Sequence, residues 1–135
     1  PRGGARQGGG SGQGKLTAFL AWKLRHGAKE RHLERLAEWR KRKGIPKPQA
    51  LEEKPDEVWP ELIPIWNAWH ELSVSRPVGM AASGVPWAEQ SRFCEDNGIH
   101  GQERLRWIRL LRAMDLVYLS QSAEKAKGAK RGSES

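Results

Sequence analysis

Cys94 and His100 come nearest to a catalytic pair in this chain, because a thiolate can act as a nucleophile and an imidazole can take its proton. The two residues lie six positions apart. Phe93 and Cys94 belong, however, to an apolar stripe, and a buried cysteine usually behaves as a small hydrophobic residue. We therefore predict that Cys94 is a core residue, that the chain has no catalytic residues, and that it is not an enzyme.

Histidine and cysteine spacing argues against a metal site. His26 and His32 lie six positions apart, and His70 and His100 are isolated. No pair has the three-residue interval that places two imidazoles on one helix face, and Cys94 has no second cysteine as a co-ligand. A single cysteine also excludes an intramolecular disulfide and favours a reducing compartment. We expect neither a metal nor a cofactor.

Charge is distributed unevenly along the 135 residues, whose net charge is +8. Residues 1–50 carry thirteen Lys/Arg against three Glu, whereas residues 51–119 carry seven Lys/Arg against eleven acidic residues. A basic arm favours an anionic partner, either nucleic acid or an acidic protein face, and it equally suits a solubilising tail. The Gly-rich run at 8–12 lacks the preceding strand and the Gly-Lys-Ser/Thr ending of a phosphate-binding loop.

The elements that position these residues are predicted to be helices. Apolar residues recur at helical spacing over 15–43, interrupted near Gly27, and the long apolar face from Leu105 to Leu119 predicts a helix over about 102–122. Shorter helices are expected after Trp59 and over about 86–96. The chain divides into a disordered Gly/Arg-rich tail at 1–14, a basic helical region at 15–43, a Pro-rich linker at 44–57, a compact Trp-rich helical unit at 58–122 and a disordered basic tail at 123–135.

Strand-like alternation is absent from the sequence, so the predicted fold class is all-α. The architecture is a small bundle of three to four helices, with an additional basic N-terminal helical region and disordered tails. No apolar run is long enough to span a membrane, and no signal peptide is visible. We expect a cytoplasmic protein with no membrane partner.

Arg76 and Asp115 are predicted to form a structural ion pair. Arg76 lies in an irregular segment, 73–86, and Asp115 lies among apolar residues of the last predicted helix. A charge in such a position is rarely left without a partner. Asp115 should therefore anchor this segment through Arg76 or through backbone amides, although a solvent-facing Asp115 is the alternative.

Seven tryptophans are many for a chain of this length. Core packing is the default expectation for large aromatic side chains at inward helical positions. A unit this small cannot easily bury all of them, so some are expected to contact a partner. The predicted partner-binding residues are Trp59, Trp66, Trp69, Met80 and Trp87.

Residues 58–119 carry a set of landmarks in a recognisable order. They are Glu71-Leu72 at a helix end, Arg76-X-X-Gly79-Met80, Val85-Pro86-Trp87, Asn97-Gly98-Ile99, and Arg112-Ala113-Met114-Asp115 followed by Tyr118-Leu119. This order resembles the small helical tail-assembly chaperones of long-tailed bacteriophages and prophages.

The resemblance implies a non-enzymatic binding role. Such proteins keep the tape-measure protein soluble, help the tail tube protein assemble around it in the bacterial host, and are absent from the finished virion. Many are frameshift extensions of an upstream chaperone segment, which would be a further partner. A chain that opens at Pro1 fits that origin, and fits trimming equally well. Two alternatives stay open: a small nucleic-acid-binding packaging protein, and a structural tail or connector component.

Overall fold

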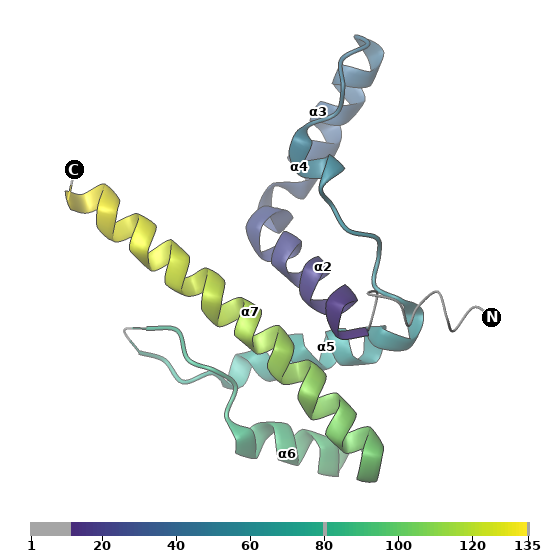
Figure 1. The fold of residues 1–135 in the computed structure, drawn as a ribbon, viewed down its shortest axis with the longest axis vertical. Helices are drawn as coiled ribbons and strands as arrows, with labels where there is room; N and C mark the ends of the chain where they lie inside the picture. The colour runs from purple at the N-terminus through teal and green to yellow at the C-terminus, as the bar shows by residue number, and fades with distance from the viewer. Residues whose placement is uncertain (1–11, 80, 135) are drawn as a thin grey trace.

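A computed structural model describes residues 12–79 and 81–134 (Figure 1). The described residues form helices and connecting segments and contain no strand, which confirms the all-α fold class. The elements in chain order are α2 (Gly12–His26), η1 (Gly27–Lys29), α3 (Glu30–Arg42), α4 (Gln49–Glu52), η2 (Pro60–Leu62), α5 (Ile63–Leu72), η3 (Ser73–Ser75), α6 (Trp87–Asp96) and α7 (Gly101–Glu134).

The core lies where α2 and α5 pack against α7 (Figure 1). Its most deeply buried side chains come from all three helices and from the turn before α5: Leu16, Leu20, Leu62, Ile65, Leu111 and Met114. Aliphatic side chains at helical spacing on each partner explain this packing, because their apolar stripes face one another.

Helix α2 belongs to the same core as the Trp-rich helices. Leu16 and Leu20 are completely buried, and Gln121 of α7 donates a hydrogen bond of 3.0 Å to the backbone oxygen of Ala21. The sequence predicted a basic helical region at 15–43, separate from the compact unit at 58–122. The structure divides that region differently: its first half packs in the core.

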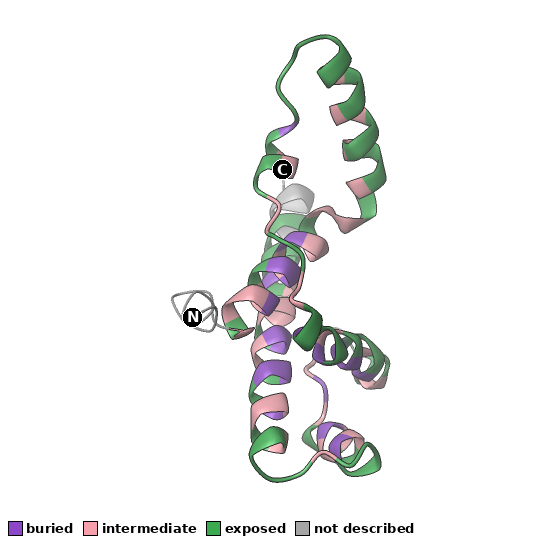
Figure 2. Ribbon diagram, turned by 90° about the vertical axis from the view of Figure 1, so that its right-hand side faces the viewer, coloured by how far each residue is buried: buried purple, intermediate pink, exposed green. Residues whose placement is uncertain are grey.

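The second half of that region, α3, projects away from the core as an arm, together with α4 and the irregular segments that connect them (Figure 2). No residue of α3 is buried. The base of the arm is tied down by Glu30, which accepts hydrogen bonds from Lys23 (2.5 Å) and Lys54 (2.6 Å). At the far end Gly44 has a φ of +72°, a left-handed conformation that favours glycine where a helix stops.

Helix α7 is longer than the sequence analysis predicted. It continues to Glu134, through a segment that was expected to be a disordered tail from residue 123. Ala, Glu and Lys dominate this extension and have high helix propensity, and Arg25 of α2 lies 3.9 Å from Glu124. Residues 12–14 of the other expected tail form the first turn of α2, and residues 1–11 lie outside the described part. No helix in the described ranges is both long and apolar enough to cross a bilayer.

Candidate partner-binding surface

One face of α7 carries large apolar side chains that the rest of the described chain leaves uncovered. Leu105 is 63% exposed and Leu116 is 67% exposed. Arg109 and Arg112 lie between them, so the four residues follow one another at intervals of four, three and four, which places them along one side of the helix. Leu105 and Leu116 therefore leave apolar surface uncovered at both ends of this stripe.

A hollow of about 470 Å³ runs along this stripe. We call it the α7 groove and define it by the residues that line it: Gln13, Leu105, Ile108, Arg109, Arg112, Ala113 and Leu116. Gln13 comes from the first turn of α2, and the other six residues come from α7. The groove therefore lies over α7 on the side where α2 begins.

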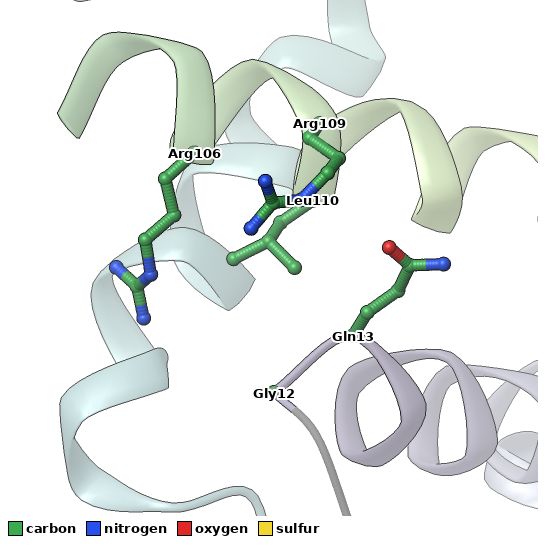
Figure 3. Close-up of a pocket in the computed structure, with 5 residues that line it drawn as sticks. All are labelled: Gly12, Gln13, Arg106, Arg109 and Leu110. Atoms are coloured by element: carbon green, nitrogen blue, oxygen red, sulfur yellow. The ribbon is translucent and has the colours of Figure 1, made fainter. Parts of the chain in front are cut away.

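Smaller hollows continue the α7 groove on either side. The first, about 350 Å³, lies between Arg106 and Arg109 of α7 and the start of α2, and Figure 3 shows both arginines projecting toward the side of Gly12 and Gln13. The second, about 200 Å³, is shared between Leu116 and Leu119 of α7 and the segment that leads into α6. Together they extend the uncovered surface across the width of α7.

The α7 groove is positively charged. The side chains of Arg109 and Arg112 are exposed and make no hydrogen bond or ion pair with any residue in the described ranges. Arg106, beside the groove, is paired loosely with Glu103 at 3.6 Å. No carboxylate is among the residues that line the groove. A partner that covers this surface therefore meets guanidinium groups without counter-ions beside exposed leucine side chains.

Asp115 fixes the segment that borders the second hollow. Its Oδ1 accepts a hydrogen bond from the Arg76 guanidinium, and its Oδ2 accepts one of 2.8 Å from the backbone N–H of Val85. The Trp69 indole N–H also donates to Oδ1, at 3.2 Å. The structure thus brings together the two residues predicted to pair, and it uses a backbone amide as well.

The Arg76 guanidinium is enclosed on its other sides. It donates a hydrogen bond of 2.9 Å to the backbone oxygen of Ser83, and its central carbon, Cζ, lies 4.0 Å from the centre of the Tyr118 ring. Stacking on an aromatic face and pairing with a carboxylate are interactions that a planar guanidinium combines well. This cluster places Val85 and the start of α6 next to α7.

The five predicted partner-binding residues are not gathered at one place. Trp87, at the start of α6, is 59% exposed. Trp59 and Trp66 are half-buried, and the Trp66 ring lies between Phe19 and His70, with ring centres 5.2 and 4.8 Å away. Trp69 is 4% exposed and belongs to the core. Met80 lies outside the described residues.

Cys94 is completely buried, whereas His100 is exposed. Burial raises the pKa of the Cys94 thiol, an effect that the nearby Arg104 only partly opposes. A buried, protonated thiol is a poor nucleophile. Within the described ranges, His, Cys, Asp and Glu side chains do not gather in threes as metal ligands.

The α7 groove is not among the sites predicted from the sequence. Leu105 was expected on the inward face of the last helix, but it is 63% exposed, whereas the neighbouring Arg104 is bonded to Ser91 and Glu95 of α6. A signal was present: Arg109 and Arg112 share the side of the helix on which Leu105 and Leu116 lie, and a buried stripe does not carry two arginines without carboxylates.

Comparison with known protein families bears on what this surface serves. Residues 39–120 match a family model described as phage tail assembly chaperone. No curated protein and no solved structure matches the chain. The matched segment is more than half of the chain and runs from the end of α3 through α5, α6 and the groove-bearing part of α7, while α2 lies before it. The chain belongs to the phage tail assembly chaperone family.

Proposed function

We propose that this protein binds the tape-measure protein, the tail tube protein or both while the phage tail assembles in the cytoplasm of the host, and that it is absent from the finished virion. The observation that carries the proposal is the family match over residues 39–120. Its role is to bind and release, without a chemical step.

The uncovered apolar residues of α7 and α6 support this role. Tape-measure proteins are long and helical, and the apolar faces of their helices need cover until the tube encloses them. Leu105, Leu116 and Trp87 are large apolar side chains that are each more than half exposed, and they are available for such contacts. Trp87 is therefore retained as a partner-binding residue, together with the α7 groove.

Co-expression with the tape-measure protein and the tail tube protein of the same phage tests the proposal. We expect one or both to stay soluble only when this chain is present, and to be recovered with it by affinity purification. Mass spectrometry of purified virions should not detect the chain. Insoluble clients in both co-expressions would contradict the proposal. Salt-sensitive binding to phage DNA in the same preparation, with no effect on either client, would favour the packaging role instead.

A further inference from the structure

We propose that the α7 groove binds an acidic amphipathic helix, whose apolar residues cover Leu105 and Leu116 and whose carboxylates pair with Arg109 and Arg112. The identification of that helix as a segment of the tape-measure protein rests on the proposed function. The binding chemistry of the groove does not depend on it.

The shape of the groove fits a helix. Leu105 and Leu116 are eleven positions apart on α7, which corresponds to about 16 Å along the helix axis, or three turns. Ile108 and Ala113 line the floor between them. A partner helix lying along α7 would present residues every third or fourth position to both leucines, as helices do when they pack side by side.

The charge of the groove requires an acidic partner. A helix that buries Leu105 and Leu116 also removes water from Arg109 and Arg112, which lie between them. Removing water from a guanidinium is costly unless a carboxylate takes its place, and these two arginines have no such partner among the described residues. An apolar helix alone, or a basic one, would leave the charges buried and unpaired.

The same reasoning disfavours a second copy of this chain as the occupant. Two α7 grooves facing each other in a symmetric dimer would bring their arginines together, and like charges across an interface oppose association. The leucines disfavour nucleic acid, since they offer nothing to a phosphate backbone. Both occupants remain outcomes of the experiment.

The direct test is the binding of fluorescent peptides to the full chain, measured by anisotropy. The first probe is a designed helical peptide of about 20 residues with leucines at three- and four-residue spacing and glutamates beside them. The second has lysine in place of every glutamate. Overlapping peptides that tile the tape-measure protein of the same phage form the third set. We expect the glutamate peptide to bind and the lysine peptide not to bind.

Two double variants probe the groove, and each has a matched control on the same chain. Leu105→Asp with Leu116→Asp removes the apolar contacts, and Val78→Asp, at a fully exposed valine, controls for it. Arg109→Glu with Arg112→Glu reverses the charge, and Lys125→Glu with Lys127→Glu, at exposed positions farther along α7, controls for that. All of these side chains are exposed, so melting temperatures should stay close to that of the unmodified chain.

We expect each groove variant to weaken binding of the glutamate peptide about tenfold or more, and each control to change it less than about twofold. The lysine peptide should bind the Arg109→Glu, Arg112→Glu variant better than the unmodified chain, which a merely structural effect cannot produce. Equal binding of the glutamate peptide to either groove variant and to the unmodified chain would overturn the proposal. The proposal would also be overturned if the α7 groove formed a dimer of this chain and the peptide bound only to that dimer. It would be overturned as well if DNA displaced the glutamate peptide and lost its own binding in the same groove variants.

The co-expression assay separates this proposal from the proposed function. If the tape-measure protein stays soluble with the groove variants as well as with the unmodified chain, the α7 groove is not the client site although the chaperone role stands. If neither the tape-measure protein nor the tail tube protein binds, but the glutamate peptide binds with the predicted variant pattern, the groove chemistry stands and the proposed function fails.

Discussion

Asp115 occupies an apolar part of α7 with both carboxylate oxygens in use. Oδ2 accepts from the Val85 amide at 2.8 Å, while Oδ1 accepts from Arg76 and from the Trp69 indole. The side chain is nearly buried, as is that of Arg76. Removing one partner of such a pair costs more than the pair itself contributes, because the other charge is left without water or a counter-ion.

Asp115→Asn should therefore lower the free energy of unfolding by about 2–4 kcal/mol. The amide keeps the size of the carboxylate but places a donor near either the Val85 N–H or the Arg76 guanidinium. Proteolysis within residues 76–86 should also become faster. The matched control is Glu89→Gln, which removes an exposed pair with Arg92 at 3.5 Å and should cost less than about 1 kcal/mol. Equal melting and equal proteolysis of Asp115→Asn and the unmodified chain would show that Asp115 does not anchor this segment.

The ionisation of Glu30 makes the stability of the protein depend on pH in a predictable direction. Hydrogen bonds from Lys23 and Lys54 hold its pKa below the ordinary value of 4.5, so its contribution to stability is present above pH 4.5 and is lost as the pH falls through the lowered pKa. The pKa of Lys54 is raised above 10.5 by the same contact, so its contribution is present below pH 10.5 and is lost as the pH rises through the raised pKa.

Glu30→Gln should lower stability by about 1 kcal/mol at neutral pH, with a difference that shrinks in acid below pH 4.5. Chemical denaturation of both chains at several pH values measures this difference. Glu38→Gln, at an exposed position on the same helix, is the control and should show no such change. A stability difference that stays constant from pH 7 to pH 3 would contradict the assignment.

For individual residues, the sequence predicted the pairing of Asp115 with Arg76. An aspartate among Met114, Leu116 and Val117 needs a partner wherever it is buried, and Arg76 was the cation in the irregular segment. The exposure of individual tryptophans could not be predicted. Trp66 and Trp69 lie three positions apart on one helix. Only the packing of α2 and α7 around that helix decides that Trp69 is buried and Trp66 is half-buried.

Among the elements, the segment between η3 and α6 packs close against α7 at Gly84. A Cβ atom at Gly84 would lie 2.9 Å from Asp115 Oδ2 and 3.7 Å from Leu119 Cδ1. The next residue donates its amide to the same carboxylate oxygen. Backbone at this position can approach Asp115 only because glycine has no side chain.

Gly84→Ala should destabilise the protein by about 1–3 kcal/mol, because the segment or Asp115 must move to make room. Gly79→Ala is the matched control in the same segment: nothing lies within 4 Å of the added Cβ, so its effect should be small. Thermal denaturation measures both. A Gly84→Ala chain as stable as the Gly79→Ala chain would mean that the close approach is not maintained in solution.

Helix positions were predictable from local signals, and helix ends were not. Pro86 before α6 and Asn97-Gly98 after it mark that helix in the sequence, and α6 spans Trp87–Asp96. The end of α7 carries no stop signal before Gly128. Residues 123–129 of its extension are exposed, and Ala, Lys and Glu there have high helix propensity. A prediction based on apolar periodicity therefore ended the helix near Ser122, where the apolar residues end.

For the molecule as a whole, sequence patterns could not predict that α2 packs into the same core as α5 and α7. The family match begins at residue 39, yet Leu16 and Leu20 are buried against residues inside the matched segment. The four buried residues of α2 fall within one short apolar run, Leu16 to Trp22, which by itself does not show what it packs against. They become core residues only because α5 and α7 leave a face of matching size uncovered.

Leu20→Ala should consequently destabilise the whole molecule by about 2–5 kcal/mol, the usual cost of removing a buried leucine side chain. Leu105→Ala makes the same chemical change at a leucine that is 63% exposed and should cost much less. Unfolding should remain a single transition, and amide hydrogens of α7 between residues 107 and 118 should exchange faster by the factor that the lost stability dictates. If Leu20→Ala instead melts α2 alone and leaves exchange in α7 unchanged, α2 is a separate unit that merely rests on the matched segment. A single transition with faster exchange in α7 would make α2 an integral part of the fold, although the family match does not include it.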